Sequence, residues 1–365
     1  MPRHQILSRL ARHFPIVWVE RPAGWRDYWL PNGKRFLQRD RWQYPLDNLA
    51  VLTTGWRRPL VFRPPWLMRQ TWRSRLRLAQ KCLQQQGARR LALYLWRDEE
   101  APAVDCIPHD FSCYHIDDNY SFSDTEVANA PIEVALLHRV DQVIVHSPAL
   151  QAKKGGINPR TELIPNGADC KLFATPAPEP ADLRNVPHPR IGYVGVIKKQ
   201  LDLALLVRLA RSRSDWKFVL VGPVGNMAGK ETMLAELKAQ PNVIFLGGKP
   251  ANELPAYVQH LDVCLMCYEL NDYTKYIYPL KLNEYLAAGK PAVSSPIETV
   301  RSYSDVVTLA QTDAEWITGI EKGLSPSAES SALVEARQCR ASENDWDLIV
   351  ERIARIFREG LERSK

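Results

Sequence analysis

The sequence predicts an α/β protein with two domains, each built around a parallel sheet. Short apolar runs without polar alternation recur along the chain, and such runs are typical of strands buried on both faces of a sheet. Segments with apolar residues at helical spacing lie between the runs, which is the order expected of a parallel sheet with crossover helices. The length of 365 residues also exceeds the roughly 250–300 residues at which single cores stop growing.

The apolar runs are predicted as strands on both sides of a proline-rich segment. They are residues 16–19, 91–96, 111–116, 143–145, 190–194, 217–221, 242–246, 263–266 and 292–294. Helices are predicted at 203–211, 231–239 and 280–288. A last helix begins at Trp346 and carries one apolar stripe.

The proline-rich segment separates the two halves of the chain. Residues 174–189 hold five prolines, which can neither continue a helix nor join a central strand. We therefore predict an N-terminal domain at 1–173, a linker at 174–189, a C-terminal domain at 190–340 and a final helix at 341–365.

Charge is distributed unevenly. The net charge is +7, yet residues 1–90 contain 19 Lys and Arg against 4 Asp and Glu, and they hold seven of the eleven tryptophans. The remainder is acidic in balance. This asymmetry predicts an anionic partner for the first segment alone, and a membrane surface and a nucleic acid are both candidates.

The seven cysteines are scattered along the chain. Cys264 and Cys267 form the one close pair, and they coincide with an apolar run, so we predict buried thiols rather than zinc ligands. Free thiols fit a reducing cytoplasm. The sequence has no apolar stretch of about 18 residues and no recognisable signal peptide, so we expect a cytoplasmic protein.

The first candidate site follows the strand predicted at 190–194. Gly195 lets the backbone approach a ligand there, and Lys198 and Lys199 come shortly after it. An ordinary strand-to-helix turn would have the same glycine, so the pattern leaves both interpretations open.

The second candidate site is the start of the helix predicted at 280–288. Pro279 suits a first helical turn, and Lys281 lies within that turn, where the helix dipole disfavours a cation unless an anion is nearby. A diphosphate would supply the anion, and Glu284 would accept hydrogen bonds from neighbouring ribose hydroxyls. A surface helix with solvated Lys281 and Glu284 is the alternative.

The N-terminal half offers two further candidates. His115, Asp117 and Asp118 come at the end of the predicted strand 111–116, at the edge where ligands bind in open parallel sheets. Adjacent carboxylates point to opposite sides of an extended chain, so we do not expect the two aspartates to share a metal ion; helix capping is their alternative role. Asn166-Gly167, before the linker, is a turn sequence.

In this order, the motifs resemble the GT4 family of retaining GT-B glycosyltransferases, in the branch that builds bacterial cell-surface polysaccharides. The stretches that carry the resemblance are Tyr114-His-Ile-Asp-Asp118, Asp141-Gln-Val-Ile-Val-His-Ser-Pro-Ala149, Ile164-Pro-Asn-Gly167, Ile191-Gly-Tyr-Val-Gly195, Phe218-Val-Leu-Val-Gly-Pro223, Asn242-Val-Ile-Phe-Leu-Gly247 and Pro279-Leu-Lys-Leu-Asn-Glu-Tyr-Leu-Ala-Ala-Gly-Lys-Pro291. The resemblance implies two Rossmann-like domains facing an interdomain cleft, with a C-terminal helix that crosses back to the first domain.

The resemblance also implies the site residues and the donor. An NDP-sugar would be held mainly by the C-terminal domain, without a metal ion or other cofactor. Glu284 would bind the donor ribose, and the backbone of Pro279, Leu280 and Lys281 would face the diphosphate. His115 would lie near the transferred sugar.

The chain departs from the family in the donor domain. The family has a glutamate eight positions before Glu284, where this chain has Tyr276. Its Arg and Lys after the glycine loop fall on Val196 and Leu201. Lys198 and Lys199 lie near enough to substitute for them.

A further departure lies at the N-terminus. Residues 2–10 resemble the family's first helix, but the strand and glycine-bearing loop that should precede it are absent from this chain. We therefore expect an upstream in-frame start that restores a strand and a loop, or weak activity of the chain as it stands.

The sequence thus predicts a retaining, metal-independent hexosyltransferase of polysaccharide biosynthesis. It would move a sugar from an NDP-sugar to a hydroxyl of a glycan or lipid-linked acceptor. Helix N-termini and one or more of Lys198, Lys199 and Lys281 would oppose the charge that develops on the diphosphate. A sugar-nucleotide epimerase on the same fold and a non-catalytic sugar-nucleotide-binding or assembly protein are the alternatives.

A helix with an apolar stripe beside a row of arginines is predicted after Pro64-Pro65. The stripe is Met68, Trp72, Leu76, Ala79 and Leu83, and the row is Arg69, Arg73 and Arg77. This pattern is found in helices that lie in a membrane interface. We expect peripheral attachment to the inner face of the cell membrane through residues 56–83, and no nucleic-acid partner; a core-facing helix with solvated arginines is the alternative.

Overall fold

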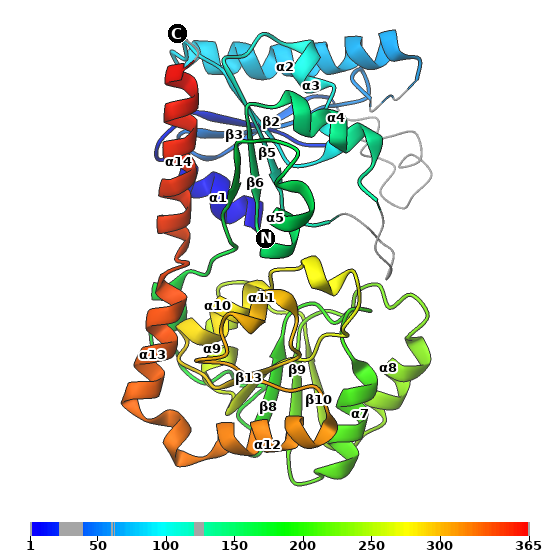
Figure 1. Cartoon of the computed structure of the whole chain (residues 1–365), viewed down its shortest axis with the longest axis vertical. Coiled ribbons are helices and arrows are strands. Elements are labelled where there is room, and N and C mark those ends of the chain that lie inside the picture. Colours follow the sequence, from blue (N-terminus) through cyan, green and yellow to red (C-terminus); the bar gives the residue numbers. More distant parts are fainter. Residues whose placement is uncertain (1, 22–38, 60, 62, 120–127, 364–365) are drawn as a thin grey trace.

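The computed structural model describes residues 2–21, 39–59, 61, 63–119 and 128–363. Figure 1 shows them as two α/β units stacked along the long axis, with the last helix running beside the first unit. The strands form a four-stranded, a six-stranded and a three-stranded sheet. The two larger sheets are parallel throughout, so the predicted α/β class with two parallel-sheet domains is confirmed.

The four-stranded sheet is the centre of the N-terminal domain and has the strand order β4-β5-β6-β7. Its strands are β4 (Ala92–Leu95), β5 (Phe111–Ile116), β6 (Gln142–Val145) and β7 (Thr161–Leu163). The helices of this half are α1 (Pro2–Leu10), α2 (Pro65–Gln85), η3 (Asp98–Glu100), α3 (Ala103–Cys106), α4 (Pro131–Arg139), α5 (Pro148–Lys154) and α6 (Cys170–Ala174). Strand β5 is buried along its whole length, as its apolar run predicted.

A separate three-stranded sheet lies beside this domain. It contains β1 (Ile16–Val19), which matches the prediction, and two strands that the sequence did not reveal, β2 (Arg41–Leu46) and β3 (Leu49–Thr53). Strand β3 pairs parallel with β1 and antiparallel with β2. Strand β2 is mostly exposed and contains Pro45, so it has neither the continuous apolar run nor the alternation that identifies a strand.

The six-stranded sheet is the centre of the C-terminal domain and has the order β10-β9-β8-β11-β12-β13. Its strands are β8 (Arg190–Val194), β9 (Lys217–Val221), β10 (Val243–Gly247), β11 (Val263–Met266), β12 (Ala292–Ser294) and β13 (Thr308–Leu309). The helices are α7 (Leu203–Ser212), α8 (Glu231–Lys238), α9 (Leu254–Gln259), η4 (Thr274–Tyr276), α10 (Leu280–Ala287), α11 (Glu298–Arg301), α12 (Asp313–Leu324), η5 (Pro326–Glu329) and α13 (Ser331–Ser342). The strand order reverses between β8 and β11, which is the switch point where ligands bind in such sheets.

The two close cysteines lie in this sheet or directly after it. Cys264 belongs to β11 and Cys267 follows it, and both are buried free thiols. Burial raises the pKa of each thiol to about 12. The prediction that these two thiols are buried is confirmed.

The last helix returns the chain to the N-terminal domain. Helix α14 (Trp346–Arg363) lies along α1 and the four-stranded sheet (Figure 1). The ring of Phe357 contacts those of Tyr94 and Phe111, with centroids 4.9 and 5.3 Å apart. The apolar stripe predicted from Trp346 onward is therefore the surface that fastens this helix to the first domain.

Helix α2 corrects one expectation. Its apolar stripe faces the protein, since Leu76 and Ala79 are buried and Trp72 packs against the same core cluster. The stripe therefore cannot insert into a membrane. The exposed face instead carries basic residues one turn apart, namely Arg69, Arg73, Arg77 and Lys81.

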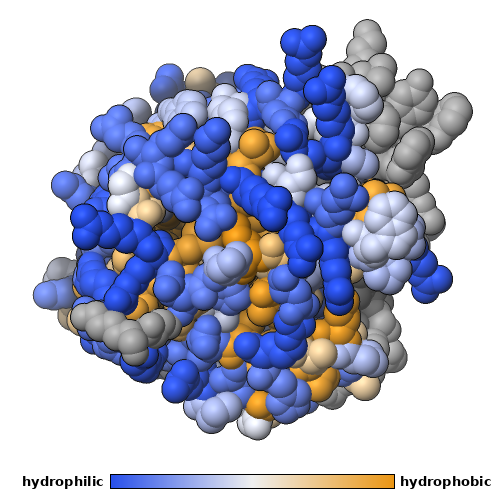
Figure 2. Space-filling view, turned by 90° about the horizontal axis from the view of Figure 1, so that it is seen from above, coloured by the Kyte–Doolittle hydropathy of each residue, from blue (hydrophilic) through white to orange (hydrophobic). Residues whose placement is uncertain are grey.

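This basic face lies at the upper end of Figure 1. Figure 2, which looks down on that end, shows mostly hydrophilic side chains with apolar ones in a band between them. Trp66, at the start of α2, is 65% exposed. No helix of the described residues is long and apolar enough to cross a bilayer.

A buried ion pair joins α4 to α5 under the four-stranded sheet. Lys154 Nζ lies 2.6 Å from Glu133 Oε1, and the hydroxyl of Tyr114 donates a hydrogen bond to the same oxygen at 3.1 Å. All three side chains are buried. Removing one member of such a pair leaves an uncompensated charge in the core.

We expect Lys154→Met to lower the free energy of unfolding by about 3–5 kcal/mol, because Glu133 loses its counter-ion. The matched control is Arg139→Met, which breaks the exposed pair with Asp105 and should cost about 0–1 kcal/mol. Urea denaturation at pH 7 measures both. Equal losses in the two variants would contradict the assignment.

Candidate functional site

Backbone without side chains forms the floor of the site at the switch point. Gly195 follows β8 with φ +150°, and a Cβ atom added there would lie 2.9 Å from Lys281 Cε and 3.0 Å from its Nζ. Gly222 follows β9, and a Cβ atom on it would lie 2.0 Å from the carbonyl oxygen of Gly195. Only glycine fits at Gly222, because the atom in the way is backbone, and at Gly195 the positive φ disfavours any other residue.

Lys281 lies in the first turn of α10, as the sequence predicted. The helix begins at Leu280 after Pro279, and its first turn has no acidic residue. Lys281 Nζ donates a hydrogen bond to the Tyr268 hydroxyl at 3.1 Å and lies 4.8 Å from the ring centroid of Tyr193. Two tyrosines, rather than a carboxylate, therefore hold this ammonium in place.

The ammonium of Lys281 remains charged at neutral pH. Burial lowers its pKa, but the surrounding Tyr193 and Tyr268 outweigh that effect and the net direction is upward. A fixed positive charge thus lies at the end of α10 where the helix dipole is also positive. That combination attracts an anion, and the backbone N–H groups of the first turn point the same way.

Glu284 lies one turn further along α10. Its side chain is half-buried, and no described residue donates a hydrogen bond to the carboxylate. Burial raises its pKa, and the nearby Lys281 acts in the opposite direction. A half-buried carboxylate with free acceptor atoms can receive hydroxyl groups from a ligand.

The loop after Gly195 carries Lys198, which is exposed, and Lys199, which is half-buried. The ammonium of Lys230 fixes this loop, since it donates to the carbonyl oxygen of Lys199 at 2.6 Å and pairs with Glu269. A catalytic role for Lys198 and Lys199 stays a prediction.

His115 lies at the end of β5 inside an aromatic cluster. Its ring stacks on Trp96 with centroids 4.2 Å apart, and its Nδ1 lies 2.6 Å from the hydroxyl of Tyr94. Burial, together with the nearby His146 and Arg3, lowers its pKa well below the usual value. Neutral His115 can accept a hydrogen bond from the Tyr94 hydroxyl at Nδ1, and its own proton is then on Nε2.

The two aspartates after β5 bind different elements, as their adjacency predicted. Asp117 lies 3.5 Å from Arg3 of α1, and Asp118 accepts a hydrogen bond from the Tyr273 hydroxyl at 2.9 Å. Burial raises the pKa of Asp117. Over residues 2–21, 39–59, 61, 63–119 and 128–363, no group of three or more His, Cys, Asp or Glu could hold a metal ion.

Asn166 and Gly167 lie where the chain leaves the N-terminal domain. The side-chain amide of Asn166 donates to the carbonyl oxygen of Tyr278, and the backbone carbonyl oxygen of Asn166 accepts from the side-chain amide of Asn283 at 2.8 Å. These bonds connect the N-terminal domain to the start of α10. A direct contact of Asn166 or Gly167 with the donor stays a prediction.

Sequence reasoning missed the aromatic residues that position the charged ones. Tyr193 had a local signal, because it lies inside the glycine motif that ends β8. Tyr268, Tyr273, Trp96 and Arg3 had none: they are distant in sequence from the residues they contact, and only the fold brings them together.

Known proteins that resemble this chain are glycosyltransferases, as the GT4 resemblance of the sequence predicted. Residues 188–324 match a family model described as glycosyl transferases group 1. The chain is 27% identical over 231 residues to the putative teichuronic acid biosynthesis glycosyltransferase TuaH of Bacillus subtilis. That match covers 60% of this chain and 57% of the relative's length.

Solved structures show the fold. The Anabaena protein HepE in complex with UDP and glucose superimposes with a TM-score of 0.59 at 20% identity, covering 73% of this chain and 78% of the other. An Escherichia coli structure described as trehalose-6-phosphate bound with UDP-2-fluoro glucose gives a TM-score of 0.67 at 13% identity, covering 97% and 94%. The fold is therefore GT-B, with two Rossmann-like domains.

In fold, the protein is of the GT-B type, and its matches make it similar to glycosyltransferases. The match of residues 188–324 to glycosyl transferases group 1 agrees with the GT4 resemblance of the sequence.

The neutral state of His115 predicts a pH dependence of stability. Its folded pKa is depressed, so below the ordinary pKa of about 6.5 the unfolded chain takes up a proton that the folded chain does not. The stability that His115 contributes is present above that pH and is lost as the pH falls, with a slope of up to about 1.4 kcal/mol per pH unit.

His115→Gln removes this titration while retaining an acceptor for Tyr94. The difference in unfolding free energy between wild type and His115→Gln should therefore narrow by roughly 1 kcal/mol from pH 7.5 to 5.5. Urea unfolding at the two pH values measures it, and His146 is present in both proteins and cancels. A difference that stays constant with pH would show that His115 is not held neutral.

Proposed function

We propose that the protein transfers a sugar from a nucleoside-diphosphate sugar to an acceptor hydroxyl, with retention of configuration and without a metal ion. The observation that carries this proposal is the charged Lys281 in the first turn of α10, over Gly195, with the carboxylate of Glu284 open one turn later. The ammonium and the helix N-terminus suit a diphosphate, and Glu284 suits the two hydroxyls of a ribose.

UDP is the nucleotide with which to begin. The structural neighbours cited above are described with UDP or a UDP-sugar bound. Lys281 and the helix N-terminus recognise a diphosphate whatever the base, so they support a nucleotide donor without selecting the base.

In the proposed reaction, the bond between the sugar's anomeric carbon and the diphosphate oxygen breaks while the acceptor oxygen attacks from the same face. The acceptor hydroxyl gives its proton to the departing diphosphate. Lys281 and the N–H groups of α10 oppose the charge that develops there. To His115, Asp117 and Asp118, at the carboxyl edge of the other sheet, we assign contact with the sugar or the acceptor.

The proposed acceptor is a glycan or lipid-linked hydroxyl at an anionic membrane surface. The support is the exposed row Arg69, Arg73, Arg77 and Lys81 on α2, with Trp66 at one end. Each basic residue near an anionic surface contributes about 1 kcal/mol. Attachment through this row is electrostatic, because the apolar face of α2 is already packed in the core.

Glu284→Gln should raise the dissociation constant of UDP roughly tenfold, about 1.4 kcal/mol, because the amide is a weaker acceptor for ribose hydroxyls. Isothermal titration calorimetry measures the constant. Glu298→Gln, an exposed change in the same domain, should leave it unchanged.

EDTA should change sugar transfer little in the same preparation. Unaltered UDP affinity in Glu284→Gln would exclude Glu284 from the nucleotide site, and loss of transfer on chelation would exclude the metal-free reaction.

The protein should sediment with anionic liposomes at low salt, remain in solution with neutral ones, and be released as the salt concentration rises. Replacing the four basic residues of the α2 row by Gln should abolish sedimentation. The control variant replaces four exposed basic residues of the C-terminal domain by Gln, namely Arg211, Lys238, Arg301 and Lys322. It removes equal charge and should still sediment with anionic liposomes. Equal binding by both variants would mean that net charge, not this face, attracts the membrane.

A further inference from the structure

The first turn of α10 is tied to both segments of chain that pass between the domains. The first segment contributes Asn166, whose amide donates to the carbonyl oxygen of Tyr278 at 3.1 Å. Asn283, in α10 itself, donates back to the carbonyl oxygen of Asn166 at 2.8 Å. These two bonds enclose the residues at which α10 begins.

The network continues through two tyrosine hydroxyls to the second segment. The hydroxyls of Tyr278 and Tyr303 lie 2.6 Å apart, and the side-chain amide of Asn344 donates to the Tyr303 hydroxyl at 2.9 Å. Asn283 also donates to the Tyr278 hydroxyl, at 3.3 Å. All of these side chains are buried, so every bond in the network is shielded from water.

The two passing segments are also bonded to each other. The N–H of Ala168 donates to the carbonyl oxygen of Asn344, and the N–H of Trp346 donates to that of Ala168, at 3.1 and 3.0 Å. A Cβ atom on Gly167 would lie 2.5 Å from the Asn344 carbonyl oxygen. The close contact of the segments therefore requires glycine at position 167.

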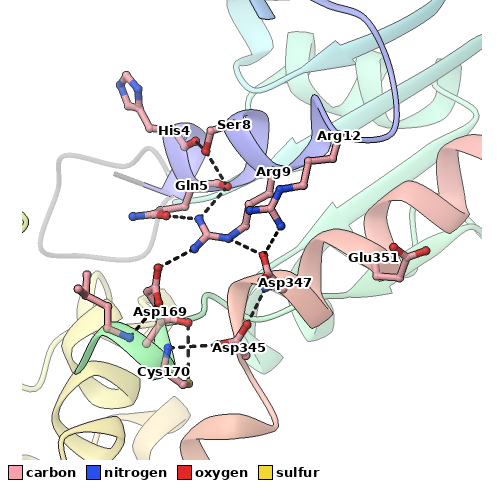
Figure 3. A network of polar contacts seen from close by, with 12 residues as sticks. His4, Gln5, Ser8, Arg9, Arg12, Asp169, Cys170, Asp345, Asp347 and Glu351 are labelled. Carbon is pink, nitrogen blue, oxygen red and sulfur yellow. Dashed lines mark hydrogen bonds and ion pairs between the residues drawn. The ribbon is translucent and has the colours of Figure 1, made fainter. Parts of the chain in front are cut away.

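Arg9 of α1 fastens the same two segments to the N-terminal domain, as Figure 3 shows. Its guanidinium lies 2.8 Å from Asp169, at the start of α6, and 2.8 Å from Asp347, at the start of α14. Asp345 accepts the N–H of Cys170 at 3.1 Å and so adds a further bond between the segments. The two segments that pass between the domains are thus bonded to each other and to α1.

We propose that Tyr303 is a positioning residue for the nucleotide-binding end of α10. The Tyr303 hydroxyl bonds to both Tyr278 and Asn344. It therefore connects the residue that precedes the first turn of α10 to the second of the two segments that pass between the domains. Without its hydroxyl, the Asn344 amide and the Tyr278 hydroxyl each lose a buried partner, and the first turn of α10 loses one of its fixed points. Nothing places Tyr303 itself against the nucleotide.

This inference rests on the proposed nucleotide site, and UDP is the probe. Tyr303→Phe should raise the UDP dissociation constant roughly threefold to tenfold, because the first turn of α10 loses one of its fixed points. Tyr257→Phe removes a hydroxyl that bonds to Asp182 elsewhere in the same domain, and should leave UDP affinity unchanged. Calorimetry is performed well below the melting temperature of each variant, so that every sample is folded.

Asn344→Ala tests the same connection from the other segment. It should weaken UDP binding to a similar extent, and the double variant with Tyr303→Phe should lose less than the two single losses combined, because both changes remove one connection. It also provides the test if Tyr303→Phe does not fold. In a transfer assay, the variants should raise the donor KM more than they lower kcat.

The outcomes separate the two proposals. A wild-type protein that does not bind UDP would overturn the proposed nucleotide site and this inference with it. A wild type that binds UDP, with affinity unchanged in Tyr303→Phe and Asn344→Ala, would overturn only the positioning role. Strictly additive losses in the double variant would also overturn it, because they would show two independent effects.

Discussion

A lysine ammonium at the positive end of a short helix is the constraint around which the C-terminal site is arranged. Helix α10 begins at Leu280, and the charge of Lys281 opposes the helix dipole. Tyr193 and Tyr268 hold that charge where β8 meets the loop after β11, and the lysine lies against the backbone of Gly195. The helix dipole disfavours the ammonium of Lys281, yet the two tyrosines hold it there, and an anionic ligand would relieve this repulsion. The backbone of Gly195 lies beside the ammonium.

The N-terminal domain contributes to this site by holding α10. Ser147 donates to the carbonyl oxygen of Tyr276, and Asn166 to that of Tyr278, so the segment before α10 is bonded to the other domain. The ring of Tyr276 is itself buried in the N-terminal core cluster. This accounts for a departure from the GT4 pattern: where the family has a glutamate, the chain has an aromatic residue that packs between the domains.

The carboxyl edge of the N-terminal sheet has different electrostatics. His115 is buried and neutral between Tyr94 and Trp96, while Asp117 is paired with Arg3. Because Nδ1 accepts from Tyr94, the neutral imidazole of His115 has its Nε2–H to donate to a sugar hydroxyl in the proposed reaction, and it does not attract the diphosphate. In the proposed reaction, charge for the leaving group and hydrogen bonding for the sugar come from different sheets.

The sequence by itself determined most of the buried strands, the starts of α7, α8, α10 and α14, and the placement of Lys281 and Glu284 on one helix, because apolar runs, proline positions and the helical period are local properties. It did not reveal the antiparallel pairing of β2 with β3, because β2 has no strand pattern of its own. Nor did it decide which side of α2 is buried: a stripe of apolar residues is the same in sequence whether it meets a core or a membrane. The tertiary structure decided that, as it decided that tyrosines hold Lys281 and that Tyr303 joins Asn344 to α10. Those contacts link residues far apart in the chain, so no local pattern records them.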